Sequence, residues 1–142
     1  MTKPTVPPEL RRQVSIDAQY RCGYCHTTQQ IVGGPMVIDH LVPIARGGLT
    51  ARENLWLACR RCNEFKGTLT EAIDPQTNLK AALFNPRTQS WSVHFAWSRD
   101  GTEIIGLTTN GRATVIALRL NNPEIVVARA LWVQVGWHPP KD

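Results

Sequence analysis

Hydrophobic positions recur at helical spacing near the start of the chain. Over residues 9–20, Leu10, Val14, Ile16 and Ala18 lie among arginine and glutamine side chains, directly after a Pro-Pro pair. Residues four apart share one face of a helix, and proline is tolerated in the first helical turn. The pattern therefore predicts a helix here, preceded by a loose arm in the Pro-rich residues 1–8.

Shorter apolar runs follow and predict two strands and a second helix. Residues 36–44 form a β-type run that ends at a Gly-Gly pair, and residues 55–58 form another. The residues 45–53 between them contain Gly, Thr and Arg, which predicts a surface loop. The charge pattern of residues 59–66 predicts a brief helix that ends at Gly67.

The second half of the chain predicts a connector, a hairpin and two helices. Residues 68–85 are punctuated by proline and predict a connector. Apolar and other side chains alternate over residues 91–97, and residues 103–107 return after a turn, which predicts a β-hairpin. Two helices are expected after it, at residues 112–120 and at residues 123–135, the second with Asn122 as its N-cap.

Composition limits the classes of protein that this chain can be. Its 142 residues, of which 42% are hydrophobic, predict one domain over residues 1–142 with a modest core. No run approaches the roughly 18 apolar residues of a membrane span, so a soluble, cytoplasmic protein without a membrane partner is expected. The net charge of +5 favours a polyanionic partner but does not identify it.

Four cysteines are arranged as two Cys-x-x-Cys pairs, Cys22 with Cys25 and Cys59 with Cys62, with 33 residues between the pairs. A reducing cytosol disfavours disulfides, and a redox motif needs only one such pair. Two pairs can give one tetrahedral zinc four thiolates, whereas His26 is a weak competitor as ligand. The sequence therefore predicts a structural zinc site with four cysteine ligands, with free core cysteines as the alternative.

An Asp39-His40 pair lies between the two cysteine pairs, and Asn63 follows the last cysteine directly. An Asp carboxylate and an Asn amide oxygen are hard ligands that suit Mg²⁺ or Mn²⁺ and leave positions open for phosphate and water. The histidine can take a proton from water as general base. Neighbours on a strand face opposite sides, so this arrangement requires the strand to end or bend at the pair.

These residues, read with Gly47-Gly48, Glu53-Asn54-Leu55 and the run from Cys59 to Gly67, resemble the HNH endonuclease family, in the branch framed by two Cys-x-x-Cys pairs. The resemblance covers residues 21–67, and its three signature positions fall on His40, Asn54 and Asn63. It implies an α+β protein with a ββα-metal (His-Me finger) core over about residues 9–67, and Asn54 as the residue that orients His40. The C-terminal extension, about residues 85–137, has no role that the resemblance supplies.

The resulting hypothesis is a metal-dependent endonuclease that hydrolyses DNA, with RNA as an alternative substrate. Its catalytic residues are Asp39, His40, Asn54 and Asn63, and its catalytic ion is Mg²⁺ or Mn²⁺. Three basic residues beside the short helix are candidates for phosphate contacts, with a solvated helix face as the alternative: Arg60, Arg61 and Lys66. The rival functions are a catalytically silent, zinc-stabilised nucleic-acid-binding module and a zinc-stapled protein-interaction domain. The five tryptophans, His94 and His138 are expected to be structural.

Overall fold

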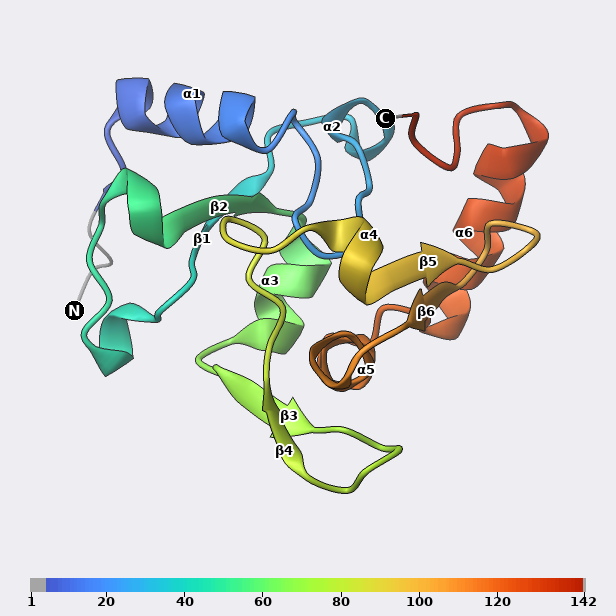
Figure 1. Ribbon diagram of the computed structural model, residues 1–142. Coiled ribbons are helices and arrows are strands. Elements are labelled where there is room, and N and C mark those ends of the chain that lie inside the picture. Colours follow the sequence, from blue (N-terminus) through green and yellow to red (C-terminus); the bar gives the residue numbers. More distant parts are fainter. Residues whose placement is uncertain (1–4, 142) are drawn as a thin grey trace. The chain divides into compact units, whose positions relative to one another are not determined.

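The computed structural model describes residues 5–141, so half of the arm predicted over residues 1–8 lies outside the described residues. The chain divides into two compact units, residues 1–70 and residues 71–142 (Figure 1). The boundary lies inside the predicted connector. A single domain over residues 1–142 stays a prediction, and each unit is described by itself below.

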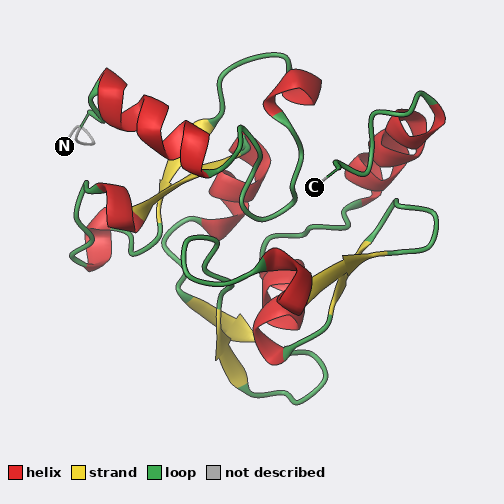
Figure 2. Cartoon of the chain, turned by 45° about the horizontal axis from the view of Figure 1, so that its top comes forward, coloured by secondary structure: helices red, strands yellow, loops and turns green. Residues whose placement is uncertain are grey.

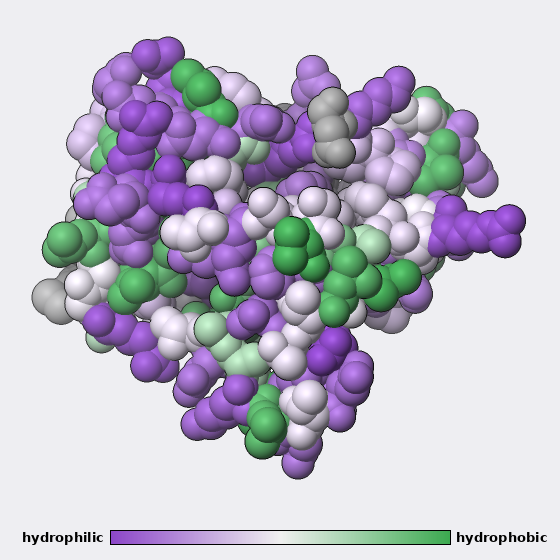
Figure 3. Space-filling model, viewed as in Figure 1, coloured by the Kyte–Doolittle hydropathy of each residue, from purple (hydrophilic) through white to green (hydrophobic). Residues whose placement is uncertain are grey.

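The described part of the first unit contains three helices and one pair of strands (Figures 1 and 2). Its elements are α1 (Pro8–Asp17), α2 (Gln29–Val32), β1 (Val37–His40), β2 (Leu55–Ala58) and α3 (Arg60–Lys66), with short 3-10 turns at Ile44–Arg46 and Arg52–Asn54. Helix α1 ends earlier than residue 20, because Gln19 and Tyr20 adopt positive φ angles of 56° and 55°. Hydrophilic residues predominate on the outer side of α1, at the upper left of Figure 3, although the helix also exposes Ile16.

Strands β1 and β2 pair antiparallel, with Val37 opposite Ala58 and His40 opposite Leu55. The continuation of the first strand to residue 44 was wrong, since β1 ends at His40. Beyond it, the N–H and C=O groups of Val42 bond to the side chain of Asn54 instead of to a neighbouring strand. The strand therefore ends at the Asp39-His40 pair, as the proposed chemistry requires.

A helix on each side completes the core of the first unit. Helix α1 contacts β2, and α3 contacts β1, so that the hairpin and α3 form a ββα arrangement. Cys59 caps α3 with its sulfur, and Gly67 ends the helix at a φ of 51°, a conformation that favours glycine. The buried side chains of this core include Val14, Tyr24, Ile38, Leu55, Leu57 and the four cysteines. The ββα core and the mixed α+β class are confirmed.

The described part of the second unit contains two hairpins and three helices. Its elements are β3 (Glu71–Ile73), β4 (Lys80–Ala82), α4 (Trp91–His94), β5 (Phe95–Trp97), β6 (Ile104–Gly106), α5 (Thr109–Ala117) and α6 (Pro123–Gln134). The β5–β6 hairpin and both long helices confirm their predictions, and Asn122 caps α6 by accepting from the N–H of Ile125. Helix α5 begins three residues early, because the Thr108 side chain caps it.

Two predictions in this unit were wrong. The connector over residues 68–85 contains the antiparallel β3–β4 hairpin. The strand expected over residues 91–97 begins only at Phe95, because its first half forms helix α4. The turn of α4 places the Trp91 ring 5.4 Å from that of Trp97. The alternating apolar residues therefore belong to a helix followed by a strand.

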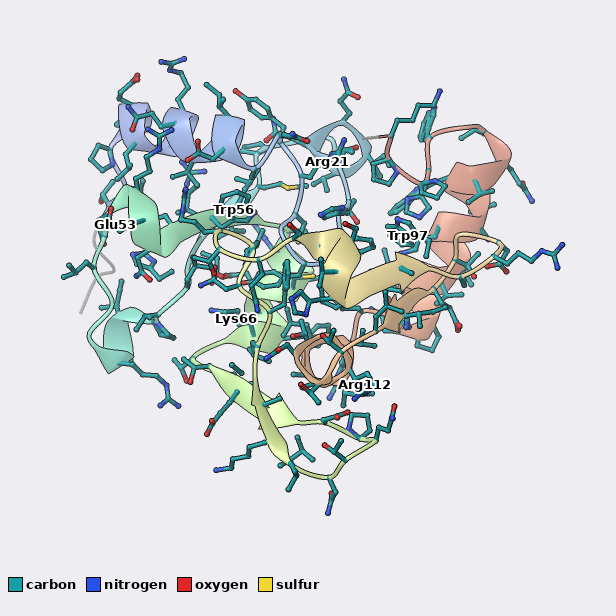
Figure 4. All side chains as sticks on the ribbon, viewed as in Figure 1. Arg21, Glu53, Trp56, Lys66, Trp97 and Arg112 are labelled. Atoms are coloured by element: carbon teal, nitrogen blue, oxygen red, sulfur yellow. The ribbon has the colours of Figure 1, made fainter. Side chains whose placement is uncertain are left out.

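Polar side chains are buried with partners in the second unit. Asp74, which follows β3, forms two hydrogen bonds with Arg112 on α5 (labelled in Figure 4), at 2.9 and 3.0 Å. This ion pair lowers the pKa of Asp74. His94 and His138 are buried, as expected for structural histidines. The tryptophans were expected in the core or at an interface: four of them are half-buried, whereas Trp137 is 62% exposed and does not lie in the core.

No helix in the described part of the chain is both long and apolar enough to cross a membrane.

Candidate nuclease site

The two cysteine pairs meet at one buried point. All four sulfur atoms lie within 4.8 Å of one another, and those of Cys25 and Cys59 are 3.7 Å apart. Sulfurs that share a tetrahedral zinc, each about 2.3 Å from the ion, are about 3.8 Å from one another. The spacing therefore fits a metal ion of this size, and the four thiols are positioned to bind one.

Local backbone structure produces this cage. An isolated β-bridge between Arg21 and Thr28 closes the loop that carries Cys22 and Cys25, which we call the first knuckle. The second knuckle carries Cys59 and Cys62 at the start of α3, where the sulfur of Cys59 accepts from the N–H of Cys62 at 3.4 Å. At Cys25 the surroundings favour a negative sulfur, since an Arg61 nitrogen lies 3.9 Å from it. Hydrogen bonds from the neighbouring cysteines lower the pKa of Cys25, whereas burial raises that of Cys22.

Asp39 lies on β1, and its side chain is buried with two donors. The Tyr24 hydroxyl donates to Oδ2 at 2.7 Å, and the Lys66 ammonium donates to Oδ1 at 3.2 Å. Burial, followed by the neighbouring Asp39 carboxylate, raises the pKa of Tyr24 well above its usual value, so the phenol stays protonated and donates. Asp39 and Lys66 are each only 3% exposed, so this is a buried ion pair.

His40 is the last residue of β1, and its ring lies beside the loop that joins the two strands. A hydrogen bond of 2.9 Å connects its Nε2 to the hydroxyl of Thr50. The main-chain carbonyl of His40 accepts from the Lys66 ammonium at 3.1 Å. The carboxylate and the imidazole are therefore neighbours in sequence but have different side-chain partners.

Asn54 holds the loop between the strands in place. Its carbonyl oxygen accepts from the N–H of Val42 at 2.8 Å, and its amide nitrogen donates to the carbonyls of Val42 and Leu49 at 3.0 and 2.9 Å. Gly48 allows this close packing, because a Cβ there would lie 1.7 Å from the Val42 carbonyl oxygen. These bonds fix both ends of the loop that carries Thr50.

Asn63 lies on α3, three residues before Lys66, so the two side chains share one face of the helix. Because the Lys66 ammonium contacts Asp39, that face is turned toward β1. Figure 4 labels Lys66 on α3 and Trp56 on β2. The side chain of Asn63 is half-buried and can offer its amide oxygen as a neutral ligand.

The three basic residues predicted to contact phosphates differ in their placement. Arg60 is exposed, and Arg61 is half-buried near the cysteine cage. Lys66 is buried against Asp39, so its ammonium does not lie on the surface, and we do not retain the predicted phosphate contact for it.

Sequence reasoning missed two residues of the site. Tyr24 and Thr50 each contribute a hydroxyl, to Asp39 and to His40 respectively. Tyr24 stands inside the first Cys-x-x-Cys pair, which was a signal that it would lie near the cage. A lone threonine in a polar loop gave no such signal.

Residues 22–69 match the model of the HNH endonuclease family. Comparison with curated proteins found no match, and comparison with solved structures found none. The matched segment begins at the first cysteine of the cage and includes both strands of the hairpin and α3. A ββα core, a cage of four cysteines and an Asp-His pair at the end of its first strand accompany that match, and the likeness to the HNH endonuclease family covers residues 22–69, less than half of the chain.

Proposed function

We propose that the protein is a metal-dependent endonuclease that hydrolyses phosphodiester bonds in DNA. The observation that carries the proposal is the match of residues 22–69 to the HNH endonuclease model, together with the position of Asp39 and His40 at the end of β1. The contact between Lys66 and Asp39 supports a site in which Asp39 faces the helix surface that also bears Asn63. Zinc is the metal proposed for the cysteine cage, which serves as scaffold.

His40 is the proposed general base. When Nε2 carries the ring proton and donates it to Thr50, the lone pair of the neutral imidazole lies on Nδ1. Nδ1 then accepts a proton from the water that attacks phosphorus. Asn54 supports this step indirectly, because it holds the loop that presents Thr50 to the ring.

Asp39 and Asn63 are the proposed ligands of a catalytic Mg²⁺ or Mn²⁺. Their carboxylate and amide oxygens are hard donors, and a carboxylate that accepts two hydrogen bonds keeps further lone pairs for a cation. Such an ion, when bound, balances the charge of the phosphorane and of the leaving 3′ oxygen. The positions of Asp39 and Asn63 determine where the scissile phosphate lies relative to His40.

DNA is the proposed partner, and Arg60 is the proposed phosphate contact. Arg60 is exposed next to the cage, and the chain carries a net charge of +5, which favours a polyanion. RNA can supply the same phosphates and is an alternative substrate. The reducing cytoplasm is the compartment that suits four cysteine thiols.

The test is a plasmid-nicking assay with zinc-loaded protein, run with Mg²⁺, with Mn²⁺ and with EDTA. We expect nicks only with a divalent ion. We expect His40→Ala to lower the rate about 10²- to 10⁴-fold, the range for loss of a general base. Asn63→Ala should also lower the rate, whereas Glu64→Ala, at the next and exposed position of the same helix, should not.

Zinc content and the circular dichroism spectrum serve as folding controls for each variant. A His40→Ala protein that holds one zinc and nicks plasmid at the original rate contradicts the role of His40. An active wild-type protein whose activity survives EDTA contradicts the role of the divalent ion.

A second candidate is a nucleic-acid-binding module without catalysis. The observation that favours it is the burial of Asp39 beneath Tyr24 and Lys66, which leaves the carboxylate 3% exposed. Binding of plasmid without nicks under every metal condition supports this module and contradicts the endonuclease.

A further inference from the structure

Asp39 is held from two directions by segments that belong to the cysteine cage. Tyr24 is part of the Cys22-to-Cys25 knuckle, and its hydroxyl donates to Oδ2. Lys66 lies at the end of α3, the helix that begins directly after Cys59, and its ammonium donates to Oδ1. One donor therefore comes from each knuckle.

The burial of the two donors makes this arrangement specific. Tyr24 is 0% exposed and Lys66 is 3% exposed, so water does not compete for these hydrogen bonds. An ammonium is seldom buried without a role, because its desolvation opposes folding unless it is paired. The Lys66 ammonium satisfies this requirement with the Asp39 carboxylate and the carbonyl oxygen of His40.

We propose that Tyr24 and Lys66 are positioning residues that form a carboxylate clamp. The clamp orients Asp39 for the divalent ion and connects this ligand to the cysteine cage. The inference rests on the proposed function, because it takes Asp39 as a ligand of that ion. Neither Tyr24 nor Lys66 touches substrate, and both act through Asp39.

The stereochemistry of the carboxylate is compatible with this role. The two oxygens offer about four lone-pair sites, of which Tyr24 and Lys66 occupy one on each oxygen. The remaining sites can face a cation in an orientation that the clamp determines. Lys66 also holds the peptide carbonyl of His40, so one ammonium fixes the backbone that carries both the ligand and the proposed base.

The experiment measures Mn²⁺ affinity directly, by calorimetry or electron paramagnetic resonance, on zinc-loaded full-length protein. The test variants are Tyr24→Phe, which removes only the hydroxyl, and Lys66→Met, which keeps much of the side-chain volume. Matched controls are Tyr20→Phe, at a tyrosine 43% exposed, and Lys80→Met, at an exposed lysine of β4. Asp39→Asn identifies the Mn²⁺ site that is being measured.

We expect Tyr24→Phe to raise the Mn²⁺ dissociation constant about 10- to 100-fold, the usual effect of removing a partner that orients a metal ligand. Lys66→Met should raise it less, because the same change removes a like charge from beside the ion. The metal concentration for half-maximal nicking should rise in parallel, while zinc content stays at one per chain. Both control variants should bind Mn²⁺ as the wild type does. Lys66→Arg should recover part of the affinity, because it restores a cationic donor.

The clamp is overturned if Tyr24→Phe and Lys66→Met keep one zinc and bind Mn²⁺ with wild-type affinity. It is also overturned if the wild-type protein binds no Mn²⁺ at Asp39. Failure of the proposed function looks different: the wild type then binds Mn²⁺, the test variants lose affinity, and no protein nicks DNA. That result supports the clamp and contradicts the endonuclease.

Discussion

Thr50 holds the His40 ring through a hydrogen bond of 2.9 Å between its hydroxyl and Nε2. A ring nitrogen that is held by a fixed partner fixes the orientation of the ring and the direction in which the other nitrogen points. The Thr50 hydroxyl can donate or accept, so it orients the His40 ring in either tautomer.

Replacement of Thr50 by valine tests this role, because valine keeps the shape and removes the hydroxyl. We expect the nicking rate at saturating metal to fall about 3- to 10-fold, the effect of one hydrogen bond of ordinary strength. The Mn²⁺ dissociation constant should not change, since Asp39 has other partners. Thr68→Val, at an exposed threonine, is the control. A variant that loses metal affinity but keeps its turnover contradicts the assignment.

For single residues, spacing in the sequence predicted the role of a side chain where its partners belong to the same short motif. Two Cys-x-x-Cys pairs predicted the cage, and the family resemblance marked Asn54 as a residue that orients the loop. Lys66 was misread as a surface cation, because its charge pattern says nothing about the acid it meets 27 positions away in the chain. Thr50 was missed for the same reason, since only the folded loop brings its hydroxyl to His40. Tyr24 was missed although its place inside the first Cys-x-x-Cys pair was a signal.

Among the elements, those with a chemical end signal were predicted best. Cys59 and Gly67 delimit α3, and Asn122 begins α6. The β3–β4 hairpin was missed because its strands have three residues each and no strong alternation. The run over residues 91–97 was misread since four residues cannot distinguish a helical turn from a strand by apolar spacing alone.

Helix α3 should depend on the metal of the cage. Its seven residues are too few for an independently stable helix, and its N-cap is the cysteine Cys59. Removal of zinc with a strong chelator should therefore expose the α3 amides to hydrogen exchange, because zinc contributes on the order of 10 kcal/mol in structural sites. Amides of α5, in the second unit, are the internal control. Unchanged protection of α3 in metal-free protein contradicts this dependence.

For the whole molecule, the chain consists of two units that each bury their own apolar side chains. Phe84, Phe95, Ile104, Leu118 and Leu120 form the core of the second unit. All residues of the proposed nuclease site lie in the first unit. The second unit contains a buried arginine, Arg129, that donates to the carbonyls of Thr102 and Leu120.

The division leads to a prediction for a fragment of residues 1–70. We expect it to bind one zinc and to unfold cooperatively, because it is a compact unit that contains its own buried apolar side chains and the cysteine cage. It should also retain metal-dependent nicking. A fragment of residues 71–142 is the matched control and should bind no zinc. Elemental analysis and thermal unfolding measure these properties, and a fragment 1–70 that stays unfolded with zinc contradicts the independence of the first unit.

The position of the cage at both ends of the hairpin has a consequence for how the chain reaches its fold. Cys25 and Cys59 meet at 3.7 Å, so an ion shared by their sulfurs turns the intervening residues into a ring. An ion that binds before the strands pair takes up part of the chain entropy that is otherwise lost when β1 meets β2. We therefore expect β1 and β2, with His40 opposite Leu55, to pair faster in the presence of metal.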